Sequence, residues 1–176
     1  MFFGKKEQII VAKFDVEPDL RIRIKNEDDK KVAIVSKDGE IRTLWEDKEI
    51  FPFKIYNDVV LTVETSTGRK FSRNIENGYV WNGANIIKAF WIAVGSQYNP
   101  EFLEPSMVHD YFLEHASDIY YNTLNANLSK PDFRRMTSLL FRYFLKDNGT
   151  GVVKSNFMSG LVDFWQKYWC SPSWRF

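Results

Sequence analysis

Apolar and polar residues follow a short period in the first part of the chain. Leu20, Ile22 and Ile24 alternate with basic residues, the pattern of a strand that keeps one face in water. Similar runs, most of them rich in β-branched or aromatic residues, recur as far as residue 75 and favour strands. The runs are QIIVAKF, LRIRIK, KVAIVS, EIRTLW, PFKIY, VVLTVET and KFSRNI.

Stretches typical of tight turns separate these runs. NEDDK at 26–30 is composed of residues that turns tolerate. The pairs Asp38-Gly39 and Thr67-Gly68 are typical of hairpins, because glycine adopts the backbone conformations that short turns need. The first part of the chain therefore predicts antiparallel strands joined by hairpins.

Further along, the apolar positions recur with the period of a helix. GANIIKAFWIAVG ends on Gly95, a typical helix stop. Asn99 followed by Pro100 predicts the start of a second helix. Pro105 interrupts its first turns, so we expect the main body at 107–116.

Two more helices are predicted after residue 128. Ser129, with Asp132 three residues later, predicts the beginning of one helix, and Asn148-Gly149 its end. The last helix spans about 152–169. The apolar residues at helical spacing are Phe133, Met136, Leu140 and Phe144 in the first of these helices, and Val153, Phe157, Leu161, Phe164, Trp165 and Tyr168 in the second.

Strands that precede helices predict an α+β fold. We expect N-terminal antiparallel β-strands followed by a C-terminal helical layer of about four helices. Residues 1–57 are predicted to form a β-rich extension or module. Residues 58–176 then form a core with a hairpin, a strand-to-helix turn, the helices and an aromatic C-terminal tail. Whether the first fifty or so residues fold separately stays open.

The composition excludes several classes of protein. The chain has 176 residues, of which 44% are hydrophobic and 16% aromatic, enough for a core and too much for intrinsic disorder. Its net charge of +1 provides no field that would attract nucleic acid or an anionic membrane. No apolar run reaches transmembrane length, so membrane insertion is not expected. Cys170 is the single cysteine, which excludes an internal disulfide and suits a reducing compartment.

The stretch MVHDYF places His109 and Asp110 side by side in an apolar run. If the chain is an enzyme, His109 and Asp110 are its candidate catalytic residues, with His109 as a general base oriented by a carboxylate elsewhere. Asp110, Glu114 and Asp118 are spaced four apart and would form one acidic stripe on an unbroken helix. Asp110 and Asp118 are then candidate ligands of a hard divalent cation. A His-Asp pair is a weak signal of chemistry, and we favour a structural role for it.

A turn between a strand and a helix follows the strands. One strand ends near Trp81, and a helix begins near Asn85, the candidate N-cap. Asn82 and Gly83 form the turn itself. The segment lacks the glycines and the Gly-Lys-Ser/Thr of a phosphate loop, so we expect a structural turn motif of Asn82, Gly83 and Asn85.

The end of the chain, DFWQKYWCSPSWRF, is rich in aromatic residues. A proline near the end prevents an ordinary helix there. Tryptophan with arginine is typical of interfaces, so Trp169, Trp174 and Phe176 are candidate interface residues. The segment either folds back on the protein or docks on a partner.

Three stretches together resemble domain of unknown function family 1353, which occurs in phages, prophages and bacteria. They are GYVWNGANIIKAFW, EPSMVHDYF and SDIYYNTL, and the resemblance covers approximately residues 58–150. His109, Asp110 and Asp118 match the family's pattern.

The turn motif departs from the family. Asn82 stands where the family has aspartate, Asn85 where it has serine, and Ile87-Lys88 where it has Pro-Arg. An amide in place of a carboxylate removes both a charge and a general base. The resemblance therefore implies that any metal or hydrolytic chemistry at these positions is weakened or lost in this chain.

From the resemblance we expect a phage-encoded structural or interaction protein, a virion or tail accessory component, rather than an enzyme. Its partners would be other phage structural proteins or further copies of itself, and it would be made in the host cytoplasm. No cofactor is expected. Two alternatives stay open: a metal-dependent hydrolase, degenerate or intact, that uses His109, Asp110 and Asp118 with a divalent metal, and an intracellular modulator of a host protein.

Overall fold

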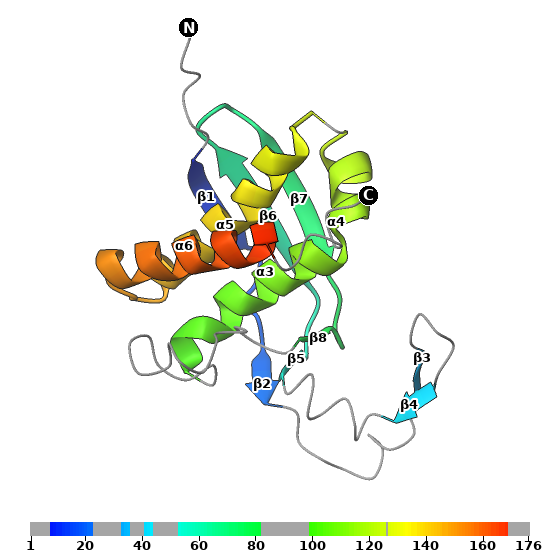
Figure 1. The fold of residues 1–176 in the computed structure, drawn as a ribbon. Coiled ribbons are helices and arrows are strands. Elements are labelled where there is room, and N and C mark those ends of the chain that lie inside the picture. Colours follow the sequence, from blue (N-terminus) through cyan, green and yellow to red (C-terminus); the bar gives the residue numbers. More distant parts are fainter. Residues whose placement is uncertain are drawn as a thin grey trace, which may run out of the picture.

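The computed structural model has the predicted α+β organisation, with antiparallel strands first and helices after them (Figure 1). It describes residues 8–22, 33–35, 41–43, 53–81, 99–125 and 127–168. The helix predicted at 83–95 lies outside these ranges.

One sheet has the strand order β1-β6-β7, with all pairs antiparallel. Its strands are β1 (Ile9–Phe14), β6 (Val59–Thr65) and β7 (Lys70–Ile75). Along β6 buried residues alternate with half-buried ones, because successive side chains of a strand point to opposite faces. Gly68 adopts φ 80° between β6 and β7, which confirms the predicted hairpin.

A second sheet has the order β2-β5-β8, also antiparallel. It consists of β2 (Leu20–Ile22), β5 (Phe53–Ile55) and β8 (Val80–Trp81). A separate antiparallel pair is formed by β3 (Ala33–Val35) and β4 (Ile41–Thr43). The turn predicted between β3 and β4, at Asp38-Gly39, lies outside the described residues.

Strands from the predicted N-terminal module share sheets with strands of the predicted core. The β1 strand pairs with β6, and β5 pairs with β8. Backbone hydrogen bonds therefore join β1, β2 and β5 to the sheets of the predicted core, whereas β3 and β4 pair with each other. The boundary predicted at residue 57 stays a prediction.

The helical part begins with the short 3₁₀ helix η3 (Pro100–Phe102) and continues into α3 (Leu103–Glu114). Pro105 lies in the first turn of α3, where a missing backbone N–H is tolerated. A short α4 (Ala116–Asp118) runs into the π-helical turn η4 (Ile119–Thr123). The two long helices are α5 (Lys130–Asp147) and α6 (Val152–Tyr168).

Both predicted ends of α5 are confirmed. The backbone N–H of Asp132 donates to Oγ of Ser129 over 3.2 Å, which satisfies one of the free donors of the first turn. The helix ends at Asp147 with Asn148 as its C-cap, and Gly149 follows with φ 84°, in the left-handed region that favours glycine.

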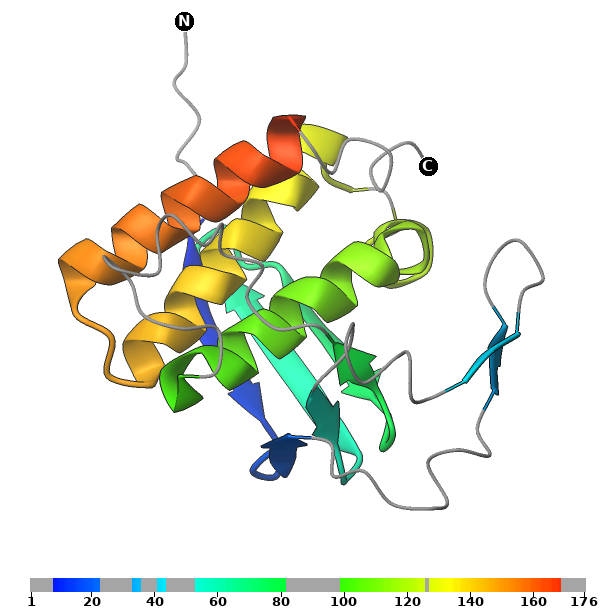
Figure 2. The same ribbon diagram turned by 60° about the horizontal axis from the view of Figure 1, so that its bottom comes forward.

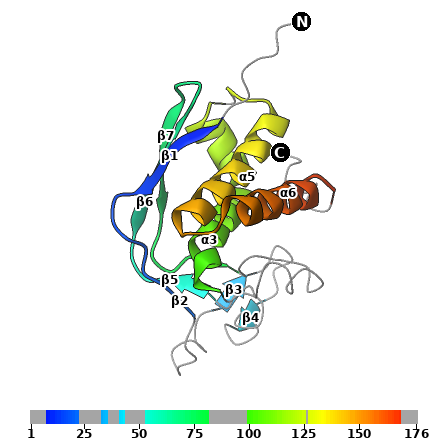
Figure 3. The same cartoon turned by 90° about the vertical axis from the view of Figure 1, so that its left-hand side faces the viewer.

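The helices form layers on one side of the strands (Figures 2 and 3). The helices α3 and α5 contact each other, α5 contacts β1, and α3 contacts β8. The α6 helix packs on α5 and forms the outer layer. The core between sheet and helices contains large buried side chains, each worth roughly 1.5–3 kcal/mol of burial energy. Among the largest are Phe53, Leu61, Ile75, Trp81, Met107, Phe112, Phe133 and Phe144.

Within the described ranges we find no helix whose length and apolar character would let it cross a membrane.

Candidate functional site

His109 and Asp110, the predicted pair, contact each other on α3. Nδ1 of His109 lies 3.1 Å from Oδ1 of Asp110. Both side chains are mostly buried, with 13% and 16% of their surface exposed. The imidazole also meets the edge of the Phe141 ring on α5, with ring centroids 5.8 Å apart. His109 therefore faces the helical layer.

The second ring nitrogen of His109 is bound by α6. The side-chain amide of Gln166 donates to Nε2 of His109, which assigns the ring proton to Nδ1, next to Asp110. The same amide nitrogen lies 3.1 Å from Oγ1 of Thr137 on α5. Thr137 in turn donates to the carbonyl oxygen of Arg134 over 2.8 Å. Three helices are thus connected by one chain of polar groups.

We call this set the His109 network: Asp110, His109, Gln166 and Thr137. Gln166 and Thr137 are fully buried. Neither residue belongs to a motif that stands out in the sequence. A signal for Gln166 existed, since it recurs at helical spacing with Ser155 and Ser159 on the face of α6 that the structure buries.

Burial affects the charge of Asp110. It raises the pKa of the Asp110 carboxyl above its usual value, while the hydrogen bond from His109 acts in the opposite direction. Burying a polar group costs free energy unless the group has a hydrogen-bond partner. The Asp110 carboxyl and the His109 imidazole therefore each depend on the other in this buried site.

Glu114, one turn after Asp110, carries the other perturbed carboxyl. Its pKa is raised to about 7, first by partial burial of the carboxyl group and then by repulsion from Asp110, although much of the residue is exposed. The hydroxyl of Tyr79 is buried nearby and has no hydrogen-bond partner within the described residues. Burial, followed by the charge of Glu114, raises the pKa of Tyr79. Tyr79 and Glu114 therefore lie close without hydrogen-bond geometry.

Asp118 does not continue the acidic stripe, because the helix is interrupted. The α3 helix ends at Glu114, and His115 adopts φ −100° and ψ 20°. Nδ1 of His115 lies 3.0 Å from the carbonyl oxygen of Tyr111, and the two rings stack with centroids 4.2 Å apart. Asp118 follows on α4, after this break.

Arg73 on β7 is the ion-pair partner of Asp118. The Asp118 carboxylate also accepts a hydrogen bond of 2.7 Å from Asn122, and this bond, with the charge of Arg73, lowers the pKa of Asp118. The guanidinium further donates to the hydroxyl groups of Tyr111 and Thr123, each over 3.3 Å. This second cluster attaches the region after α3 to the sheet.

The structure thus brings His109 and Asp110 together and directs Asp118 towards Arg73. In the ranges that the structure describes, no three His, Cys, Asp or Glu side chains converge as a metal site requires. The metal role of Asp110 and Asp118 stays a prediction. The turn motif (Asn82, Gly83 and Asn85) and the interface residues (Trp169, Trp174 and Phe176) lie outside the described ranges, and their roles stay predictions too.

Comparison of the chain with family models, with curated proteins and with solved structures gave no match.

Proposed function

We propose that the chain is a structural or interaction protein, and that the His109–Asp110 pair serves its architecture rather than catalysis. The observation that supports this most is the engagement of both ring nitrogens of His109, one with Asp110 and the other with Gln166. A general base needs a nitrogen within reach of the substrate proton. In this arrangement, the network already uses both.

The resemblance to family 1353 gives this proposal its setting. A virion or tail accessory component of a phage, synthesised in the host cytoplasm, needs a stable fold and a surface that binds other protein chains. The two polar clusters contribute to the stability of the fold. The His109 network connects three helices, and the Arg73 cluster connects the helical part to β7.

A metal-dependent hydrolase is the second candidate function. It is favoured by the raised pKa values of Asp110 and Glu114, because perturbed carboxyl groups are frequent in active sites. For such an enzyme, Asp110 and Glu114 would be the acidic residues to substitute first, rather than Asp110 and Asp118.

Thermal unfolding with Mg²⁺, Mn²⁺, Ca²⁺ or Zn²⁺ distinguishes the two candidates, measured on the wild type, Asp110→Ala and Asp110→Asn. For the structural protein we expect no metal to raise the wild-type midpoint. The alanine variant should melt earlier, and the asparagine variant should melt close to the wild type because an amide oxygen still accepts from His109. A metal that raises the wild-type midpoint, but not that of a folded asparagine variant, would contradict the proposal.

A further inference from the structure

The small sheet β2-β5-β8 has one buried face and one face that carries charge. Phe53 and Trp81 are fully buried, and their rings stack with centroids 5.5 Å apart. Because successive side chains of a strand point to opposite faces, Arg21 and Lys54 lie on the outer face. The side chain of Arg21 is 61% exposed, and Lys54 is half-buried. The outer face therefore presents basic groups to the surroundings.

The two basic residues occupy directly opposite positions. Arg21 of β2 is in register with Lys54 of β5. Residues opposite each other in an antiparallel pair have Cβ atoms about 4.5–5.5 Å apart, and like charges at these positions destabilise the sheet. A local arrangement that opposes folding is expected mainly at a functional site. The pair of cations therefore indicates a role in binding.

Tyr56, the residue after β5, holds the two cations together. The guanidinium carbon of Arg21 lies 5.2 Å from the centroid of the Tyr56 ring, and Nζ of Lys54 lies 5.0 Å from it. An aromatic ring attracts cations through its face, which opposes their mutual repulsion. The backbone N–H of Tyr56 donates to the carbonyl oxygen of Asp19 over 2.9 Å, so the ring is fixed beside the start of β2. We call Arg21, Lys54 and Tyr56 the basic clip.

Asp19 compensates only part of the charge of the basic clip. Its carboxylate accepts hydrogen bonds of 2.7 and 2.5 Å from Nε and one terminal nitrogen of Arg21. A guanidinium has five N–H donors and an ammonium has three, so both cations keep donors for a further acceptor. Among the residues that the structure describes, no carboxylate forms an ion pair with Lys54. The clip therefore keeps a positive charge in excess.

A carboxylate of a partner protein suits the basic clip better than the phosphates of a nucleic acid. Nucleic acids owe their affinity to several phosphate contacts at once, and two cations on a chain with a net charge of +1 provide few. A single carboxylate, in contrast, can accept charge-assisted hydrogen bonds from both cations. Tyrosine and arginine are also enriched among the residues that contribute most to protein–protein binding.

From this geometry we infer that the basic clip binds an acidic segment of a partner protein, with a carboxylate of that segment between Arg21 and Lys54. The inference rests on the proposed function, because it gives the chemistry of the partner of an interaction protein. Asp19 acts as a positioning residue, since it orients the guanidinium and leaves the remaining donors for the partner.

The test is the binding of a fluorescent hexaglutamate peptide to the full chain at low ionic strength, measured by fluorescence anisotropy. We expect the wild type to bind the peptide. Lys54→Glu should bind it about tenfold more weakly, because the substitution removes an attraction and adds a repulsion. The same substitution places opposite charges across β2 and β5, so the variant should unfold at the wild-type temperature or above it. Thermal unfolding thus separates lost binding from lost folding.

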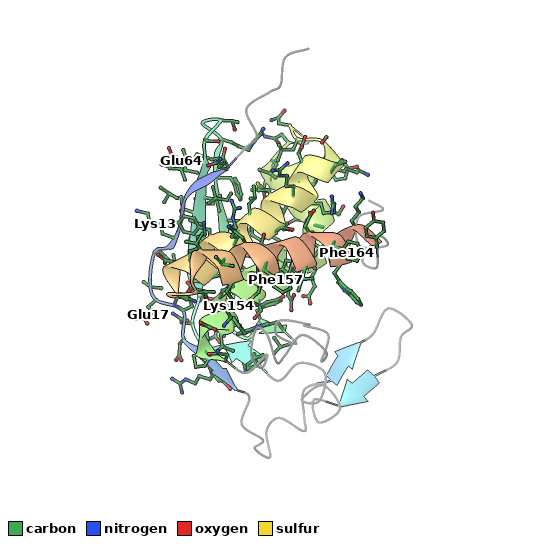
Figure 4. The ribbon with its side chains drawn as sticks, turned by 60° about the vertical axis from the view of Figure 1, so that its left-hand side comes forward. Lys13, Glu17, Glu64, Lys154, Phe157 and Phe164 are labelled. Carbon is green, nitrogen blue, oxygen red and sulfur yellow. The ribbon has the colours of Figure 1, made fainter. Side chains whose placement is uncertain are left out.

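Two further variants sharpen the test. Lys13→Glu is the matched control, because Lys13 is an exposed lysine in the other sheet, opposite Thr62 rather than a cation. Figure 4 shows Lys13 on β1 and Glu17 further along the chain towards β2. The control should weaken binding less than about threefold, because solvent screens exposed charges outside the site. Asp19→Asn should bind the peptide more tightly than the wild type, since it removes the carboxylate that competes for Arg21.

Three results would overturn the inference: no binding of hexaglutamate by the wild type, equal weakening by Lys54→Glu and Lys13→Glu, or tighter binding of an oligothymidylate of the same length. The last result would make a nucleic acid the partner. Each of them leaves the structural role of the His109–Asp110 pair standing. A metal-dependent shift in the unfolding experiment would instead remove the proposed function without changing the affinity for the peptide.

Discussion

Gln166 on α6 donates a hydrogen bond to His109 on α3, and Thr137 on α5 accepts from the same amide group. The outer helix is thus attached to the two inner helices by one buried side chain. Apolar packing has little directional preference, whereas an amide fixes both the rotation and the height of a helix. Gln166 therefore helps to fix which face of α6 is buried, together with Ser159, which donates to the carbonyl oxygen of Ser138 on α5.

The first prediction concerns Gln166. Gln166→Ala leaves Nε2 of His109 and Oγ1 of Thr137 without their amide partner in a buried site. We expect the free energy of unfolding to fall by about 1–3 kcal/mol, the cost of leaving buried polar groups unsatisfied. Urea denaturation measures it. Lys167→Ala, an exposed neighbour on the same helix, should change stability by less than about 0.5 kcal/mol. Equal effects of the two substitutions would contradict a buried role for Gln166.

A second prediction concerns the cluster around Arg73. Arg73→Met removes donors from Tyr111 and Thr123 as well as the partner of Asp118, so it should destabilise the protein by about 1–2 kcal/mol. Asp118→Asn removes only a partly exposed ion pair and should cost less than about 1 kcal/mol. Chemical denaturation of both variants and of the double variant gives the coupling energy. A larger loss of unfolding free energy for Asp118→Asn than for Arg73→Met would contradict this prediction.

The third prediction is a pH dependence caused by Glu114. Its carboxyl binds a proton more tightly in the folded protein, where the pKa is about 7, than in the unfolded chain, where it is 4.5. The folded state therefore holds more protons in this window, and stability decreases as pH rises from 4.5 to 7. Glu114→Gln removes this decrease and should be the more stable protein above the window, by on the order of 1 kcal/mol once solvent screening is allowed for.

Unfolding of the wild type and Glu114→Gln across that pH range measures the difference directly. The two curves should coincide at low pH and separate as the pH rises. Parallel curves would mean that Glu114 titrates normally in the folded protein.

A fourth prediction concerns Gly149, which ends α5 with φ 84°. Gly149→Ala should cost about 1 kcal/mol, because a Cβ atom is unfavourable in the left-handed region even where there is space for it. Gly149→Asn is the matched control and should cost less, since asparagine tolerates this conformation better. Thermal unfolding compares the two, and an alanine variant as stable as the wild type would refute the argument.

Much of the fold was predictable because its signals are local. The alternation in VVLTVET, the glycine of the β6–β7 turn and the cap at Ser129 each depend on residues within a few positions of one another. Strand pairing was not predictable from such signals. That β1 pairs with β6, and β5 with β8, depends on contacts between residues far apart in the sequence.

In the candidate site, too, some features could be predicted from the sequence and others could not. His109 and Asp110 stand out in the sequence as a polar pair in an apolar run, but their contact of 3.1 Å was not predictable, because neighbouring side chains on a helix point in different directions. The other partner of His109, Gln166, lies on another helix, so the sequence around MVHDYF contained no signal for it. The spacing of Asp118 suggested a continuous stripe, but the end of α3 at Glu114 and the attraction of Arg73 direct it elsewhere.

The pairing of β1 with β6 has a consequence for the time course of biosynthesis. A ribosome adds about 5–20 residues per second, so β1 exists for several seconds before the strand that it pairs with has been made. The hairpin of β6 and β7 is local and forms within microseconds once both strands are available. It can therefore act as the template to which the waiting β1 is added. During that interval the apolar side of β1 is open to chaperones and to strands of neighbouring nascent chains, and slower translation would lengthen its exposure.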